Sequence, residues 1–335
     1  MSRASIYLCL AIAAQTGCTR SAVRVDGVSG ILDAFTSHHI VALGEGMHGN
    51  NQAHAFRLAL VRDPRFPSLV NDIVVESGTA GYQSAMDRFV RGEDVPYAEL
   101  RHAWQDTTNP TPIWDTPIYE EFFRAVRQVN ASLPDDRKLR VLLGDPPVDW
   151  DAVRTKDDVV RLVSLRVHVV DVINKEVLSK NRRALVVYGD GHFLRYNRWV
   201  GTPSVSESTL NRIEALGTKA FNVWTNTTVE MERMQRDIAS WPVPSLAKVR
   251  GTRLGRLDFK YFSGIETDPR TKMEDQFDAV LYLGPPSSIT QSELPASLCA
   301  DAEYMKMRAA RLFIAWGEDG VASLKKECAT HTRTR

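Results

Sequence analysis

Apolar runs rich in β-branched residues alternate along the chain with charged segments that have helical spacing. The runs that begin at residues 40, 73, 139, 184, 220 and 279 are short and end at glycine, proline or a polar residue, as buried strands do. Residues 52–62, 81–91, 117–133 and 156–183 lie between them and have the apolar period of helices. This order predicts an α/β fold with a mostly parallel central sheet, helices on both faces, and a small cap of loops and helices.

The first apolar run, residues 40–43, leads directly into the segment Gly44-Glu45-Gly46-Met47-His48-Gly49. Glycine tolerates backbone conformations that side chains forbid, so a loop with three glycines can turn sharply. Such a loop can direct both the carboxylate of Glu45 and the imidazole of His48 into the same space. We therefore take these two residues as candidate catalytic groups.

Three further strand ends carry polar residues. Glu76 closes the run that begins at residue 73, Asp145 closes the run that begins at residue 139, and Gly189-Asp190-Gly191-His192 follows the run that begins at residue 184. In parallel α/β sheets the ligand crevice lies outside the carboxyl ends of the strands. We expect Glu76, Asp145 and His192 to converge there with the groups that follow the first strand.

Two carboxylates, Glu45 and Glu76, and two imidazoles, His48 and His192, support two kinds of chemistry. In the first, a neutral imidazole held by a carboxylate takes a proton from water, while the second imidazole assists the oxyanion or the leaving group. In the second, the four side chains hold a divalent metal ion that lowers the pKa of bound water. The spacing of the residues alone leaves both alternatives open.

Asp145 and three other residues are candidates for substrate binding. Arg57 follows His48 by nine positions on a predicted helix, where its guanidinium would bind a carboxylate or a developing negative charge, or form a salt bridge with a neighbouring acid. Trp104 and Trp114, with nearby prolines, would form an apolar wall beside the same edge of the sheet as Asp145. The alternative for these tryptophans is a small satellite core beneath long loops.

Composition narrows the function classes. The chain has 335 residues, of which 43% are hydrophobic and 25% are charged, as in an ordinary globular protein. Its formal net charge is +1 and it has no basic stripe, so we expect no nucleic-acid partner. Neither a phosphate-binding nor a dinucleotide-binding glycine motif follows a strand, and we expect a small-molecule substrate and no cofactor. A Gly-x-Ser-x-Gly nucleophile motif is also absent from the sequence.

The first residues resemble a bacterial export signal. Arg3 precedes a short apolar run, residues 6–14, and Gly17-Cys18 follows with a lipoprotein-type cysteine. Gln15 stands where leucine is usual, which leaves the type of cleavage open. We expect residues 1–18 to be the signal, residues 19–335 to form one α/β domain, and the protein to reach the periplasm or the outer membrane. A lipidated Cys18 would be its membrane attachment.

Two cysteines, Cys299 and Cys328, lie in the expected folded region. In an oxidising periplasm they could form a disulfide, and the alternative is two isolated buried thiols. The sequence leaves both open.

The segment Gly44–Gly49 resembles the Gly-Glu-x-x-His-Gly motif of the erythromycin esterase-like family, part of a wider group with Tiki-type metal-dependent proteases and ChaN-like haem-binding proteins. Arg57, the strand ending at Glu76, Gly144-Asp145 and His192 match that family in order. The 114–130 segment and the later strand around residues 277–280 are similar too. The ChaN-like motif has one residue fewer between the glutamate and the histidine, so the spacing favours the esterases.

This resemblance implies an α/β hydrolase-like domain that hydrolyses an ester or a lactone without a metal. His48 would be the general base, Glu45 and Glu76 would orient it and the water, and Arg57 and His192 would polarise the substrate. Other members of the group imply alternatives: a haem-binding protein with His48 or His192 as the iron ligand, or a metal-dependent peptidase with Glu45, His48, Glu76 and His192 as ligands.

The resemblance also bears on substrate size. The macrolide esterases have a large helical insertion in the region that corresponds to Asp145–His192, where this chain has only 47 positions. We therefore expect small ester or lactone substrates.

Overall fold

The computed structural model describes residues 20–195, 198–199, 208–226, 238–259, 265–266 and 271–329. The expected export signal, residues 1–18 with Cys18, lies outside these residues. In the part of the chain that the structure describes, no helix has both the length and the apolar character needed to cross a bilayer.

An eight-stranded sheet forms the centre of the structure, and its order is β1-β8-β10-β7-β2-β5-β3-β4. The six strands from β10 to β4 are parallel, β8 is antiparallel to β10, and β1 is antiparallel to β8. The strands are β1 (Arg24–Asp26), β2 (Ile40–Gly44), β3 (Asp72–Thr79), β4 (Arg140–Asp145), β5 (Ala184–Tyr188), β7 (Ala220–Asn226), β8 (Ser245–Lys248) and β10 (Ala279–Tyr282). All six predicted strands are present, and the mostly parallel sheet is confirmed.

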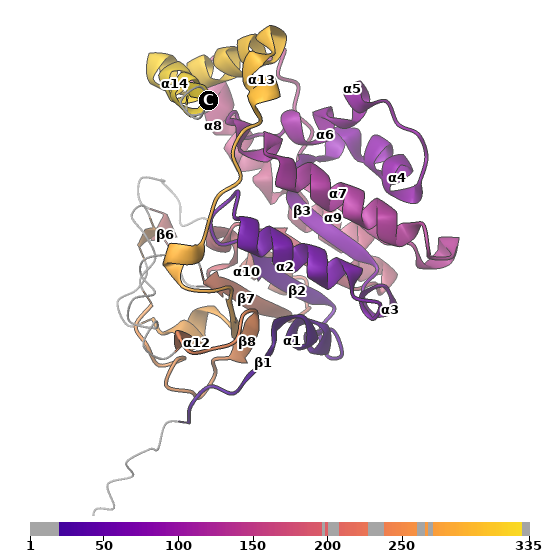
Figure 1. Cartoon of the computed structure of the whole chain (residues 1–335), viewed down its shortest axis with the longest axis vertical. Helices are drawn as coiled ribbons and strands as arrows, with labels where there is room; N and C mark the ends of the chain where they lie inside the picture. The colour runs from indigo at the N-terminus through magenta and orange to yellow at the C-terminus, as the bar shows by residue number, and fades with distance from the viewer. Residues whose placement is uncertain are drawn as a thin grey trace, which may run out of the picture.

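Helices cover both faces of this sheet, as predicted (Figure 1). Alternate strand residues point to opposite faces, so Val41 and Leu43 belong to one core cluster while Ala42 belongs to another. The first face packs against α1 (Gly27–Ala34), α2 (Asn51–Arg62), α4 (Gln83–Arg91) and α7 (Pro117–Asn130). The second packs against α9 (His168–Glu176) and α10 (Thr209–Glu214). Burial on both faces explains why the strands are apolar along their whole length.

The sequence predicted one continuous helical segment over residues 156–183, and the structure divides it. It contains α8 (Lys156–Ser164), η4 (Leu165–Val167), α9 and η5 (Leu178–Lys180). The two α-helices pack against different partners, because α8 contacts α14 (Ala302–Ala329) whereas α9 contacts β4. The 3-10 turn η4 allows the change of direction between them.

The remaining elements are short. They are α3 (Phe66–Leu69), η1 (Ala80–Tyr82), α5 (Tyr97–Leu100), α6 (His102–Gln105), η2 (Pro112–Asp115), η3 (Asp135–Arg137), η6 (Asp190–Phe193), α12 (Met273–Gln276), η8 (Pro286–Ser288) and α13 (Ala296–Ala300), with a two-stranded antiparallel sheet of β6 (Arg198–Trp199) and β9 (Ile265–Glu266).

The expected cap is built by α13 and α14, drawn in yellow above α6 in Figure 1. A disulfide joins Cys299 in α13 to Cys328 near the end of α14, so the pairing that the sequence left open is formed. Gly317 departs from helical geometry within α14, at φ 64° and ψ −147°. Arginines of α14 bind acids of η2 and of the segment after α6, which attaches the cap to the first face of the domain.

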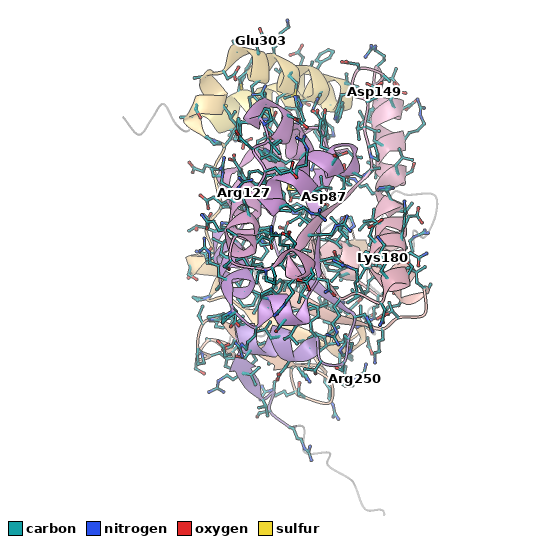
Figure 2. All side chains as sticks on the ribbon, turned by 90° about the vertical axis from the view of Figure 1, so that its right-hand side faces the viewer. Asp87, Arg127, Asp149, Lys180, Arg250 and Glu303 are labelled. Atoms are coloured by element: carbon teal, nitrogen blue, oxygen red, sulfur yellow. A yellow bond between two sulfur atoms is a disulfide. The ribbon has the colours of Figure 1, made fainter. Side chains whose placement is uncertain are left out.

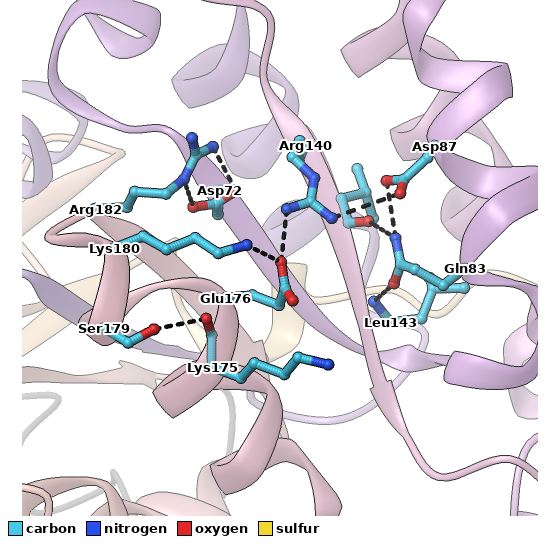
Figure 3. A network of polar contacts seen from close by, with 11 residues as sticks. Asp72, Gln83, Asp87, Arg140, Leu143, Lys175, Glu176, Ser179, Lys180 and Arg182 are labelled. Atoms are coloured by element: carbon cyan, nitrogen blue, oxygen red, sulfur yellow. Dashed lines mark hydrogen bonds and ion pairs between the residues drawn. The ribbon is translucent and has the colours of Figure 1, made fainter.

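Ion pairs bind the amino ends of β3 and β4 to neighbouring elements (Figure 3). Arg182 donates two hydrogen bonds to Asp72 at the start of β3, and Arg140 at the start of β4 pairs with Glu176 and Asp87. Charged groups at this edge are thus mutually neutralised and structural. Figure 2 shows other charged residues of both signs spread over the surface, from Glu303 on α14 at the top to Arg250 near the bottom.

Candidate active site

Three adjacent central strands bring the predicted catalytic residues together. The order β2-β5-β3 places the loop with Glu45 and His48, the loop with His192, and Glu76 of β3 at the same edge of the sheet. Strand order cannot be read from the sequence, and in the structure β5 lies between the other two strands. The three strand ends are therefore neighbours.

Glu45 is the buried anchor of the first loop. Its side chain is 5% exposed, its Oε2 binds Nδ1 of His48 at 2.8 Å, and its Oε1 binds Nη1 of Arg57 at 3.1 Å. Gly46 and Gly49 have φ values of 70° and 81°, which allow the chain to turn around the carboxylate. Arg57 lies on α2, the helix that leaves this loop. The sequence allows Arg57 either a substrate contact or a salt bridge, and in the structure its guanidinium is buried and pairs with Glu45.

Glu76 is held from the side of β5. The backbone N–H of Gly189 donates to its Oε2 at 2.8 Å, and Nε2 of His192 lies 3.2 Å from its Oε1. The other ring nitrogen of His192, Nδ1, lies 3.4 Å from the hydroxyl of Thr209. Both oxygens of Glu76 thus have a partner, and one of these is an imidazole that could turn towards a substrate.

Gly189 lies next to both His48 and Glu76. A Cβ atom built on it would lie 2.9 Å from Cε1 and 3.3 Å from Nε2 of His48, and 3.6 Å from Oε2 of Glu76. Nε2 of His48, the nitrogen that Glu45 does not hold, therefore lies beside Glu76. The side chain of His48 is 32% exposed, so this imidazole is open to solvent.

The two carboxylates set the protonation of the site. Burial lowers the pKa of His48, but the negative charges of Glu76 and Glu45 outweigh it and raise the pKa to about 9. Burial raises the pKa of Glu76, but the neighbouring His192 and His48 hold it well below its usual range. At neutral pH, His48 thus carries a proton and Glu76 is ionised.

The negative charges of Glu45 and Glu76 would also favour the binding of a metal ion. Glu45, His48 and Glu76 each offer one ligand atom, and these atoms all lie within 4.8 Å of one another. His192 is not a member of this group; its Nε2 lies 3.2 Å from Oε1 of Glu76. Carboxylate oxygens with one imidazole are a donor set for a divalent cation. A proton on His48 and a metal ion would compete for this position.

The two tryptophans proposed as a substrate wall are buried. Trp104 is 3% exposed and packs against the rings of Tyr97 and Phe123, with centroid distances of 6.3 and 5.9 Å. Trp114 is 2% exposed, and its ring lies 4.6 Å from that of His48 at 72°. Neither presents a surface to a ligand, so the proposed wall is wrong for both. Trp104 belongs to the core, and Trp114 packs against His48.

Asp145 lies at the end of β4 but acts on the protein itself. Its Oδ1 accepts a 2.7 Å hydrogen bond from the hydroxyl of Thr108, and its Oδ2 accepts one from the Thr108 backbone N–H. Arg166 donates to the same hydroxyl at 3.0 Å. Burial raises the pKa of Asp145 to about 7. The sequence predicts a substrate contact for Asp145, whereas in the structure this carboxyl fixes the loop around Thr108.

Asp190 is a site residue that our sequence reasoning did not select. It is buried between the ends of β2 and β7, where the backbone N–H of Thr225 lies 3.4 Å from its Oδ1. A Cβ atom on Gly44 would lie 1.6 Å from that oxygen, so only glycine fits at position 44. Burial raises the pKa of Asp190 well above its usual range. The Gly-Asp-Gly sequence before His192 was the available signal, because it places a carboxyl at a strand end.

Comparisons with known proteins support the fold. Neither a protein-family model nor a curated protein matches this chain. Among solved structures, a succinoglycan biosynthesis protein matches with a TM-score of 0.58 and 11% identity over 80% of this chain and 92% of its own. A Bacillus cereus protein matches with a TM-score of 0.52 and 12% identity over 78% and 91%.

A mutant of the erythromycin esterase EreC, in its open conformation, matches with a TM-score of 0.51 and 12% identity over 79% of this chain and 94% of that one. At such identities the likeness concerns the fold and leaves reaction and substrate to the chemistry of the site. The chain thus has the α/β fold of an erythromycin esterase, as the resemblance of its motifs implied.

Proposed function

We propose that this protein is a hydrolase of small ester or lactone substrates in which His48 activates water. The observation that carries the proposal is the arrangement of the His48 imidazole. Its Nδ1 is fixed by the buried carboxylate of Glu45, while its Nε2 lies on the side of the second carboxylate, Glu76, in a side chain that is 32% exposed. A base oriented through one nitrogen and open at the other is what proton abstraction from water requires.

The reaction follows from these positions. Neutral His48 accepts a proton from a water molecule through Nε2, and the water oxygen forms a bond to the carbonyl carbon of the substrate. The Nδ1–H bond to Glu45 stabilises the imidazolium that results. His192 hydrogen-bonds the oxyanion of the tetrahedral intermediate. When the carbon–oxygen bond to the alcohol breaks, the proton passes from His48 to the leaving oxygen, which restores the base.

Arg57 and Glu76 support this cycle through charge. The guanidinium of Arg57 compensates the charge of the buried Glu45 carboxylate, whose other oxygen accepts from His48. Glu76 lies beside the nitrogen that receives the proton and would orient the water.

A second candidate is a metal-assisted hydrolase, which the grouping of Glu45, His48 and Glu76 favours. When bound there, a divalent ion would lower the pKa of a water molecule and so supply hydroxide at neutral pH. The two mechanisms use the same residues and differ in what activates the water.

We further propose that the protein is exported. The support is the signal-like sequence of residues 1–18 and the disulfide between Cys299 and Cys328, since such bonds persist in oxidising compartments.

Loss of the base should abolish turnover without unfolding the chain. We expect His48→Ala to lower the hydrolysis of a short-chain aryl ester by roughly 10²–10⁴-fold, the usual contribution of a positioned proton-transfer group. His102→Ala is a matched control, because His102 is a half-exposed imidazole that also pairs with a carboxylate, that of Asp106. Steady-state kinetics and circular dichroism would measure both variants. Unchanged activity in His48→Ala would contradict the assignment.

The pKa of His48 determines the pH dependence. A protonated imidazole cannot act as a base, so kcat/KM should rise with pH and level off above about 9. Glu76→Gln removes the carboxylate charge that raises this pKa, and the midpoint should move to lower pH. Titration of the His48 ring by NMR would follow the shift even if the variant turns over slowly. A wild-type midpoint at the ordinary value of 6.5 would argue against two carboxylates acting on this ring.

Chelation separates the two mechanisms. If His48 alone activates water, dialysis against a strong chelator should leave the activity unchanged, because no ligand set has to be refilled. Activity that is lost with the chelator and returns with Mn²⁺, Co²⁺ or Zn²⁺ would support the metal-assisted hydrolase instead. Bound metal, measured in the purified protein before and after dialysis, provides the control.

The last prediction concerns the size of the substrate. The span of 47 positions between Asp145 and His192 contains α8, which packs on the cap helix α14, and α9, which packs on β4 of the central sheet. We expect simple lactones and short-chain aryl esters to be turned over in preference to a macrolide. Comparison of kcat/KM for the three substrate types, each with His48→Ala as the blank, tests this. A clear preference for the macrolide would show that this span does not limit the substrate.

A further inference from the structure

We propose that Trp114 is a positioning residue for His48 and that the C-terminal helix α14 holds it in place through the contact of Arg308 with Asp115. This inference rests on the proposed role of His48 as the base. It assigns a part in catalysis to a helix that contributes none of the candidate catalytic residues.

Trp114 packs against the ring of His48. The two rings meet edge to face, with centroids 4.6 Å apart at 72°. Tyr119 packs against Trp114 in turn, at 4.9 Å and 89°, and its hydroxyl accepts a 2.9 Å hydrogen bond from the backbone N–H of Gly49. The loop of His48 and the segment of Trp114 are thus connected by two independent contacts.

Asp115, the next residue, is held by α14. Nε and Nη2 of Arg308 donate to its two carboxylate oxygens at 2.8 and 2.9 Å, and the hydroxyl of Tyr304 also donates to it. The side chains of Arg308 and Asp115 are 1% and 0% exposed. A planar guanidinium bound to a carboxylate through two nitrogens fixes both distance and direction. Asp115 therefore has one well-defined position relative to α14.

The segment between these contacts is short and stiff. Trp114 and Asp115 are consecutive in η2, which begins at Pro112 and is followed by Pro117 at the start of α7. Proline fixes its φ angle, so a displacement of Asp115 is not easily absorbed within η2. We infer that the position of α14 is transmitted through Asp115 to Trp114 and from there to the imidazole of His48.

A neighbouring arginine of α14 provides a matched control. Arg311 binds Asp106 and the backbone carbonyl of Gln105, at 2.6 and 2.8 Å, and also helps to attach the helix. These partners lie in and just after α6. Loss of Arg311 weakens the attachment of α14 without removing the contact with Asp115.

The test uses four variants: Trp114→Leu, Trp114→Phe, Arg308→Met and Arg311→Met. For each we would measure kcat and KM. NMR spectra would give the chemical shift of the His48 Cε1 proton, which depends on the ring current of Trp114. We expect Trp114→Leu to lower kcat by about 10- to 100-fold, the effect of a catalytic group misplaced by about 1 Å, with KM nearly unchanged. Trp114→Phe should recover most of kcat. Arg308→Met should lower kcat and move the proton signal, while Arg311→Met should do neither.

Urea denaturation shows which variants are folded under assay conditions. If Arg308→Met does not fold, Tyr304→Phe, which removes one hydrogen bond to Asp115, takes its place with a smaller expected loss. Wild-type kcat in Trp114→Leu, or an equal loss of kcat in Arg308→Met and Arg311→Met, would overturn the proposal. If His48→Ala retains activity, the proposed function fails instead, and the proton signal still shows whether Arg308 and Trp114 position the ring.

Discussion

The buried carboxylate of Glu45 is the constraint on which the site depends. A carboxylate removed from water needs a compensating charge, and Arg57 on α2 supplies it at 3.1 Å. The second oxygen is then free to hold His48, and the glycines of the loop allow the chain to turn back far enough for this bond. The strand end, the loop and the first helix therefore form one unit.

Two carboxylates close to one imidazole determine what this unit can do. Glu45 and Glu76 lie near enough that a positive charge between them is favourable, and the protonated imidazole of His48 supplies that charge. The same electrostatic field that raises the pKa of His48 would attract a divalent metal ion. A basic histidine and an affinity for metal are thus two consequences of one arrangement.

The sequence was sufficient to predict the site residues that follow a recognisable local pattern. It was not sufficient for residues whose role depends on tertiary contacts. The convergence of Glu45, His48, Glu76 and His192 followed from the positions of strand ends, which are visible in the chain. The partner of Arg57 and the burial of Trp114 depend on distances between elements, and no spacing encodes them. The strands β1 and β8 were missed because they contain only one and two apolar residues, too few to form an apolar run like that of β10.

The C-terminal helix α14 shows that the function of a local motif can also depend on tertiary contacts. The motif after β2 accounts for the chemistry of His48, but the ring packs against Trp114, and the residue next to Trp114 is bound by an arginine 193 positions further along the chain. Chains with little sequence identity can share the fold and the strand-end residues while differing in such supports. A difference in what packs behind the imidazole would alter its alignment with the substrate without any change in the residues that carry the reaction.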